Sequence, residues 1–293
     1  MQSEPRHRVI ATNGVRLHTV EAGRPDGPLL ILLHGFPELW YGWRNQLEPF
    51  AAAGFRVLAP DQRGYNLSDK PRGVAAYGLD RLAGDVVGLI DEAGREKAYL
   101  VGHDWGGAVA WWTAITHPQR LERLALLNVP HPLVMRQALR RNRVQRRRSW
   151  YMFFFQLPWL PERFLRRHDF AKAAAALTRT SRPGAFAGAD LGRYRAAWAQ
   201  PGALTGMVNW YRAMVRAMPA RPRSLRVRVP TLLIWGARDR FLGRELAQPS
   251  IELCDDGRLV FLEDATHWVQ HEEPGLVNCL IADFFTPSAP SGT

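Results

Sequence analysis

The sequence is poor in cysteine and has no long apolar run. Only Cys254 and Cys279 occur among 293 residues, so a disulfide framework and a paired CxxC metal or redox motif are excluded, and two buried thiols are expected. No stretch approaches the ~18 uninterrupted apolar residues that a membrane span needs. The first residues carry no apolar segment behind their charges, which predicts a cytoplasmic location.

Lysine is scarce, and the charge is uneven. Lys70, Lys97 and Lys172 are the only lysines among 39 basic residues, and the formal net charge is +12. Residues 131–228 hold 21 basic and three acidic residues, whereas the rest of the chain has an acidic excess. A coding bias toward arginine and weak contact with an anionic surface both explain this. No RNP, zinc-finger or helix-turn-helix signature occurs, so no nucleic-acid partner is predicted.

Short apolar runs alternate with longer amphipathic stretches over residues 28–128. The runs are too short for helices and end in polar residues or glycine, so they predict strands, and the stretches between them have helical spacing. This alternation predicts an α/β fold with a mostly parallel sheet and helices on both faces. The predicted strands are 28–35, 55–61, 98–104, 121–128, 231–239 and 258–264, and the predicted helices are 42–53, 79–94 and 106–117.

A hairpin precedes this pattern and an insertion interrupts it. Residues 9–23 predict two strands joined through Asn13 and Gly14. In the second half of the chain the alternation gives way to helical, arginine-rich and aromatic sequence before it resumes, which one domain split by a helical lid explains most simply. Residues 286–293 have the composition of a loose tail. The predicted boundaries are 1–131 and 222–293 for the core and 132–221 for the lid.

The strongest chemical signal is the run from Gly102 to Gly107, where a predicted strand meets a predicted helix. It has the G-x-S-x-G spacing of a nucleophile elbow, with Asp104 in the serine position. A carboxylate has an ordinary pKa of about 3.9, so it is ionised at neutral pH without a base to activate it. It can attack an sp³ carbon to form an alkyl ester, and the missing serine excludes a serine esterase. The alternative is that Asp104 only caps the helix.

An elbow of this kind needs an acid and then a histidine later in the chain. Asp239 and His267 follow two late predicted strands, so both are expected at the sheet edge where Asp104 lies. The other acid position, after strand 121–128, holds Asn128, which favours Asp239. The competing histidines are weaker candidates: His271 is expected to be exposed, His103 to point into packing, and His117 and His168 to lie away from strand ends.

Two backbone N–H groups are expected to form an oxyanion hole. The loop after strand 28–35 supplies one at Phe36, and the residue after the nucleophile, Trp105, supplies the other. The sequence contains no HExxH, P-loop or GxGxxG motif, so no metal or cofactor is predicted.

Motifs from the hairpin to the last predicted helix carry a family resemblance. They are HGFPE, DQRGYNLSDKP, GHDWGG, LNVPHP, WYMFFFQLP, NWYRA and ATHWVQHEEP. Together they resemble the soluble epoxide hydrolases of the α/β-hydrolase superfamily. The resemblance implies an α/β-hydrolase fold and two lid tyrosines, matched here by Tyr151 and Tyr211, that donate hydrogen bonds to an epoxide oxygen. Taken without the family, both tyrosines equally fit a core or a pocket wall.

The resemblance implies a reaction in two steps, and two alternative functions compete with it. Asp104 opens the epoxide to form an ester, and water activated by His267 and Asp239 then releases a vicinal diol. A haloalkane dehalogenase shares HGFP and GHDWGG, but many such enzymes carry an amide where Phe36 stands. A non-enzymatic binding protein of the same fold is disfavoured because the acid, the base and the nucleophile are all present. Eleven Trp and thirteen Phe suggest a small apolar epoxide as substrate; the oligomeric state does not follow.

Overall fold

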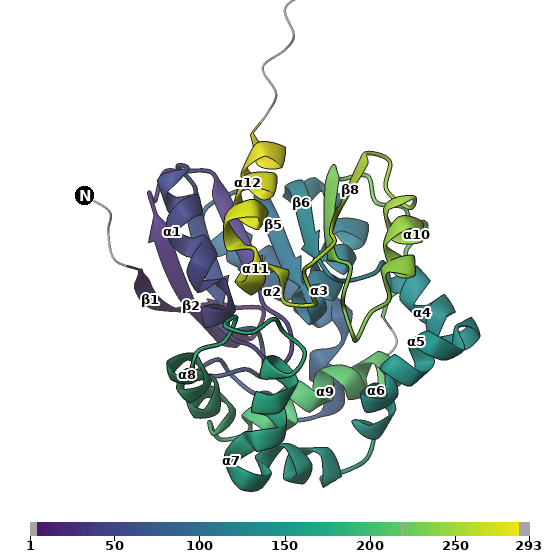
Figure 1. Cartoon of the computed structure of the whole chain (residues 1–293). Coiled ribbons are helices and arrows are strands. Elements are labelled where there is room, and N and C mark those ends of the chain that lie inside the picture. Colours follow the sequence, from purple (N-terminus) through teal and green to yellow (C-terminus); the bar gives the residue numbers. More distant parts are fainter. Residues whose placement is uncertain (1–4, 218, 287–293) are drawn as a thin grey trace, which may run out of the picture.

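A computed structural model describes residues 5–217 and 219–286, and an eight-stranded sheet forms its centre (Figure 1). The strand order is β1-β2-β4-β3-β5-β6-β7-β8. The pairs β1/β2 and β2/β4 are antiparallel and all pairs from β4 to β8 are parallel, which confirms the predicted mostly parallel sheet. The strands are β1 (Arg6–Thr12), β2 (Val15–Gly23), β3 (Leu29–Leu33), β4 (Arg56–Pro60), β5 (Ala98–His103), β6 (Leu121–Leu127), β7 (Thr231–Gly236) and β8 (Gly257–Leu262).

Helices connect the strands and also form one long segment between β6 and β7. None of the described helices combines the length and apolar character needed to cross a bilayer; the cytoplasmic location stays a prediction. The helices are α1 (Arg44–Ala52), α2 (Leu79–Glu92), α3 (Asp104–Thr116), α4 (Pro132–Arg141), α5 (Arg143–Arg148), α6 (Trp150–Phe154), α7 (Leu160–Thr178), α8 (Gly188–Trp198), α9 (Ala203–Arg216), α10 (Ala247–Ile251), α11 (Val269–Glu272) and α12 (Pro274–Phe285). Short 3₁₀ turns are η1 (Trp40–Trp43), η2 (Val74–Tyr77), η3 (Pro118–Arg120) and η4 (Arg244–Leu246).

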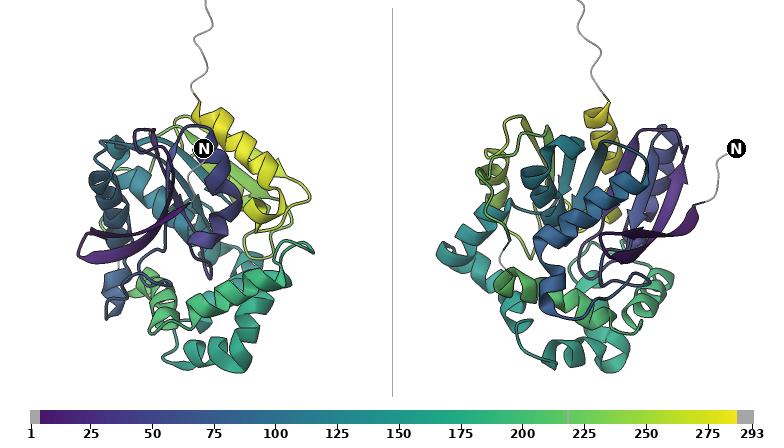
Figure 2. Two further views of the ribbon diagram at one scale, coloured as in Figure 1. Left: turned by 90° about the vertical axis from the view of Figure 1, so that its left-hand side faces the viewer. Right: turned by 180° about the vertical axis from the view of Figure 1, so that it is seen from behind.

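Both faces of the sheet are buried, which explains the unbroken apolar runs. All five residues of β3 are buried, and their side chains alternate between two hydrophobic clusters. One cluster includes side chains of α1 and α12 and the other includes side chains of α2 and α3, so helices cover each face (Figure 2). A strand that is covered on both sides needs apolar residues at every position rather than at alternate ones.

The N-terminal hairpin forms as predicted. Thr12 pairs with Val15 across a two-residue turn in which Asn13 has φ 44° and Gly14 has φ 76°. Positive φ at both positions is what a type I′ turn requires, and asparagine followed by glycine tolerates it best. The predicted loose tail lies outside the described residues except for Thr286.

Helices α4 to α9 lie together at one end of the sheet half (Figure 1). They contact the loops that follow parallel strands: the Trp198 indole N–H donates to the Pro37 carbonyl at 2.6 Å, and that of Trp210 donates to the Arg63 carbonyl at 2.9 Å. The helices therefore face the carboxyl ends of β3 and β4, where α/β sheets bind ligands. Within this segment α7 is interrupted at residues 167–170.

The prediction of two buried thiols is half wrong. Cys254 is buried, but Cys279 is exposed. Cys279 lies on α12, whose buried residues are Val277, Ile281 and Phe285. The spacing of these residues puts position 279 on the opposite, solvent side of the helix.

Glycine at the start of α3 allows this helix to approach the end of β3. A Cβ added to Gly106 would overlap the carbonyl oxygens of Leu33 and His34. We therefore expect Gly106→Ala to lower the free energy of unfolding by about 3 kcal/mol, the upper range for overpacking a core. The shift of the urea midpoint, at constant m-value, measures this loss.

Gly192→Ala is the matched control, because Gly192 lies inside α8 with no atom within 4 Å of an added Cβ. Alanine is the better helix former, so this variant should be more stable by up to about 1 kcal/mol. Equal midpoints for the two variants would contradict the close approach of α3 to β3.

Candidate active site

The candidate site lies where the order of the strands reverses direction. The chain passes from β3 to β4 on one side and then returns to β5 on the other side of β3. The carboxyl ends of β3 and β5 lie at this switch point, which is the usual ligand position in such sheets.

Asp104 occupies the sharp turn from β5 into α3. It is the first residue of α3 and has φ 50°, a conformation that costs free energy for a residue with a side chain and persists only when its surroundings enforce it. The first turn of α3 has no side-chain cap. Among the described residues the Asp104 carboxylate accepts from the Phe36 N–H and from no N–H group of α3, so the alternative role as a helix cap is wrong. The sharp turn from strand to helix has the geometry of an elbow.

The loop after β3 runs against the Asp104 carboxylate. The Phe36 N–H donates to Asp104 Oδ1 at 2.9 Å. A Cβ on Gly35 would lie 2.5 Å from the Asp104 Cβ, so only glycine allows this approach. The Trp105 N–H belongs to the first turn of α3, where N–H groups lack acceptors within the helix. Both N–H groups predicted for the oxyanion hole thus lie beside the elbow.

Asp104, His267 and Asp239 come together from the ends of three strands. His267 Nδ1 lies 2.7 Å from Asp239 Oδ2, and His267 Nε2 lies 3.6 Å from Asp104 Oδ2. The Asp104 side chain is 16% exposed, against 3% for His267 and 1% for Asp239. Asp104 is therefore the member of the three that an incoming molecule can reach, and the other two are held behind it.

Four hydrogen bonds fix the Asp239 carboxylate. Its Oδ1 accepts from the N–H groups of Phe241 and Leu242, and its Oδ2 accepts from the Asn128 amide at 2.8 Å as well as facing His267. Asn128 also accepts from the Gly236 N–H at 2.8 Å. Asn128, which the sequence offered only as the other position for an acid, therefore orients the Asp239 carboxylate.

Charge at the site is set by these contacts. Burial opposes protonation of His267, but Asp239 and Asp104 outweigh it and raise the pKa of His267 to about 10. Burial also disfavours ionised Asp104, but His267, with smaller effects of His103 and the Phe36 N–H, lowers the pKa of Asp104 below its usual value. At neutral pH His267 is therefore an imidazolium and Asp104 a carboxylate in the free site.

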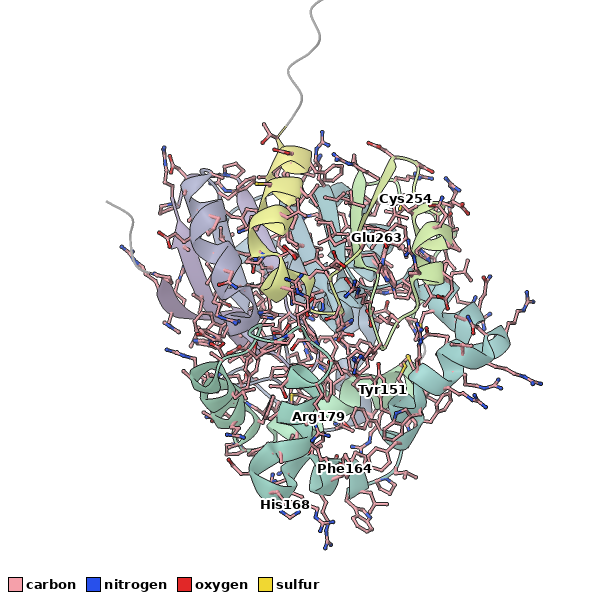
Figure 3. All side chains as sticks on the ribbon, in the orientation of Figure 1. Tyr151, Phe164, His168, Arg179, Cys254 and Glu263 are labelled. Atoms are coloured by element: carbon pink, nitrogen blue, oxygen red, sulfur yellow. The ribbon has the colours of Figure 1, made fainter. Side chains whose placement is uncertain are left out.

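Tyr151 on α6 and Tyr211 on α9 lie in an aromatic cluster over the elbow. Tyr211 packs edge-on against Trp105 at 5.0 Å and Phe36 at 5.3 Å between ring centroids, and Tyr151 packs against Tyr211 at 5.9 Å. Figure 3 shows Tyr151 at the boundary between the sheet half and the helical segment. The two tyrosines that the motifs singled out are thus brought to the residues around Asp104.

Both phenols are neutral at physiological pH. Burial and then the charge of Asp104 raise the pKa of Tyr151 well above its ordinary value of 10. Burial, Tyr151 and then Asp104 do the same for the pKa of Tyr211. A neutral phenol in an apolar cluster can donate to an oxygen on which negative charge develops.

Glu38 forms a buried cluster behind the site that sequence reasoning missed. Its carboxylate lies 2.7 Å from His271, accepts from Tyr194 at 2.7 Å and from Gln270 at 3.1 Å, and lies 3.4 Å from His103. Burial disfavours its charge, but His271 and His103 outweigh this and hold the pKa of Glu38 well below its usual range. The signal available was an acid directly after a buried strand and its HGFP turn.

The competing histidines differ in where the structure places them. The expectation that His271 is exposed is wrong, because it is buried against Glu38. His103 points into packing as expected, and its Nε2 lies 2.8 Å from the His267 carbonyl oxygen, which fixes the backbone at His267. His117 follows the last residue of α3 and His168 lies within α7, both away from the site.

No group of three His, Cys, Asp or Glu side chains within residues 5–217 and 219–286 is arranged to hold a metal ion. That the chain needs no cofactor stays a prediction.

Comparisons with known proteins agree with this geometry. Residues 28–274 match the family described as alpha/beta hydrolase fold. The chain is 50% identical over 275 residues to the AB hydrolase superfamily protein YfhM of Bacillus subtilis (94% of this chain, 96% of YfhM), and 40% identical over 281 residues to Epoxide hydrolase 4 of Homo sapiens (94% and 77%). The crystal structure of Epoxide Hydrolase A from Mycobacterium thermoresistibile superposes with a TM-score of 0.86 at 34% identity (96% and 98%). The chain therefore belongs to the epoxide hydrolases of the α/β-hydrolase superfamily.

Proposed function

We propose that the chain hydrolyses small apolar epoxides to vicinal diols through an ester on Asp104. The observation that carries this proposal is the pairing of a reachable carboxylate with two neutral phenols in one aromatic cluster. A carboxylate nucleophile needs an electrophilic carbon, and the phenols supply donors for an oxygen leaving that carbon. A strained three-membered ether offers both atoms side by side.

In the first step Asp104 attacks a ring carbon. The carbon–oxygen bond breaks, and its electron pair goes to the epoxide oxygen, which accepts hydrogen bonds from Tyr151 and Tyr211. These donors act on charge that develops in the transition state, so they lower the barrier rather than only binding the substrate. The alkoxide takes a proton from one of these phenols, which solvent reprotonates as His267 releases its own proton. The product of this step is a hydroxyalkyl ester of Asp104.

In the second step His267 removes a proton from water as the water attacks the ester carbonyl. The N–H groups of Phe36 and Trp105 hold the tetrahedral oxyanion. When it collapses, the bond from the carboxyl carbon to the alkoxy oxygen breaks, the leaving oxygen takes the proton from His267, and the diol leaves. The new Asp104 carboxyl then gives its proton to His267. Esterification removes the negative charge of Asp104, one of the contacts that raises the pKa of His267. The pKa of His267 therefore falls once the ester forms, and the residue becomes a base at the stage that requires one.

We further propose that residues 132–221 act as a lid on a core of residues 1–131 and 222–293. The support is that Tyr151 and Tyr211 come from α6 and α9, whereas Asp104, Asp239 and His267 follow strands. The lid would thus donate the hydrogen bonds and the core would carry the nucleophile, acid and base.

A substrate panel with phenol variants tests the reaction class. Wild type should form diols from aryl and alkyl epoxides and release no halide from haloalkanes. Tyr151→Phe and Tyr211→Phe should each slow ring opening about 100-fold, because a donor to developing charge is worth ~3 kcal/mol. Single-turnover rates of epoxide consumption measure the loss.

Tyr99→Phe is the matched control. Tyr99 lies on β5, where its ring packs against Phe55 and Phe285 away from the site. It should keep the wild-type rate. Halide release without diol formation would sink the proposal, as would wild-type rates in both lid variants.

Isotope labelling tests the ester. One turnover with excess enzyme in ¹⁸O-water should give unlabelled diol and labelled Asp104, because water attacks the carboxyl carbon. His267→Gln removes the base, so it should trap an adduct on the Asp104 peptide with the mass of the epoxide. His117→Gln, at a half-buried position away from the site, should turn over normally. Labelled diol in the first turnover and no trapped adduct would show that water attacks the epoxide directly.

The pH dependence should differ between the two steps. Ring opening needs ionised Asp104, whose pKa is lowered, so its rate should stay flat down to about pH 5. Ester hydrolysis needs neutral His267, so its rate should fall as pH drops below the reduced pKa that His267 has in the ester. Rapid quenching with mass spectrometry should find more ester at about pH 5 than at about pH 8. A hydrolysis rate that is independent of pH over this range would contradict the role of His267.

A further inference from the structure

An exposed apolar strip covers the outside of helices α5, α6 and the start of α7. Seven of the eleven large apolar side chains that are exposed among the described residues lie between positions 144 and 164. Trp150 and Trp159 are 59% and 63% exposed, which is unusual for the largest apolar side chain. The members of the apolar strip are Val144, Trp150, Phe153, Leu157, Trp159, Leu160 and Phe164. Such a concentration marks an interaction surface rather than scattered exposure.

The rings of α6 and α7 form a continuous surface. Trp150 packs against Phe154 at 6.1 Å, and Phe154 packs against Phe164 at 5.5 Å between centroids. Figure 3 shows Phe164 near the outer end of the helical segment, whereas Tyr151 lies toward the sheet half. Helix α6 thus presents Trp150 and Phe153 to the outside and Tyr151 to the candidate site.

Unpaired arginines surround the apolar strip. In the described part of the chain, none of the nine arginines between positions 140 and 167 forms an ion pair, and the one glutamate of this stretch, Glu162, is bound by Arg212 at 2.6 Å. Lys172 adds a cation 5.9 Å from the Phe164 ring. The nine are Arg140, Arg141, Arg143, Arg146, Arg147, Arg148, Arg163, Arg166 and Arg167. The surface therefore joins apolar side chains to an uncompensated positive charge.

We propose that the apolar strip and its arginines dock on an anionic lipid surface. Tryptophan and phenylalanine beside basic residues suit the boundary between headgroups and acyl chains, where the rings are buried and the guanidinium groups pair with phosphate. Val144, Leu157 and Leu160 gain from the same burial but cannot stack on bases, which disfavours nucleic acid. A symmetric dimer would set the same arginines against each other. Docking needs no substrate and is independent of the proposed function.

Flotation of the full chain with lipid vesicles tests this surface. The protein should float with phosphatidylcholine vesicles that contain phosphatidylglycerol, but not with phosphatidylcholine alone, and more at low salt than at about 0.1 M. Each basic residue near such a surface contributes about fivefold to binding. The triple change of Arg146, Arg147 and Arg148 to Gln should therefore weaken binding roughly 100-fold, and Trp159→Ser should weaken it at constant charge.

Two matched variants separate this face from the net charge of the whole chain. Changing the exposed Arg72, Arg81 and Arg258 to Gln removes the same charge elsewhere, and Leu276→Ser removes an exposed apolar side chain on α12. Both should bind as wild type does. The proposal fails if the two triple variants lose binding equally or if no vesicle binds. If Trp159→Ser leaves lipid binding intact and heparin competes fully with the vesicles, the surface binds polyanions through charge alone and the proposal fails. If Trp159→Ser instead abolishes a dimer seen by sedimentation velocity, the surface is a dimer interface and the proposal also fails.

Discussion

The close contact between the start of α3 and the end of β3 is the constraint on which the site depends. A helix can reach those carbonyl oxygens only where position 106 has no Cβ. That approach forces the chain through the left-handed turn at Asp104 and brings its carboxylate to the Phe36 N–H. The Asp104 carboxylate is thus aimed by close backbone packing, which resists displacement.

The buried charges of this half of the molecule are organised as two carboxylate–histidine pairs joined through the backbone. Asp239 holds His267 and Glu38 holds His271. His103 connects them, because it contacts Glu38 with one ring nitrogen and the His267 carbonyl with the other. A buried charge that loses its partner is strongly destabilising. A change at Glu38 should therefore alter the environment of His267. Among the described residues no hydrogen bond joins these two side chains directly.

Local signals account for what could be predicted from the sequence. The glycines around Asp104, and the strands before Asp239 and His267, are contiguous motifs, and topology alone brings strand ends together. Placing Tyr151 and Tyr211 over the elbow needed the family resemblance, since nothing local distinguishes a site tyrosine from a core one. The Glu38–His271 pair joins residues 233 positions apart, so neither burial could be read from its own neighbourhood. Cys279 was misjudged because composition does not say which side of α12 faces the core.

Asn128 shares with His267 one oxygen of the Asp239 carboxylate. Asn128 follows the last residue of β6, has φ 45° and lies beside the end of β7. Its side-chain amide forms hydrogen bonds with the Gly236 backbone and with the Asp239 carboxylate. Two neighbouring strand ends thus reach the same imidazole-orienting place with side chains of nearly equal shape. An exchange of amide and carboxylate between them would move the acid by 111 positions in the sequence while moving it little in space. Related chains could carry the carboxylate at either strand end, with a different spacing along the sequence but the same order between Asp104 and His267 and no change of fold.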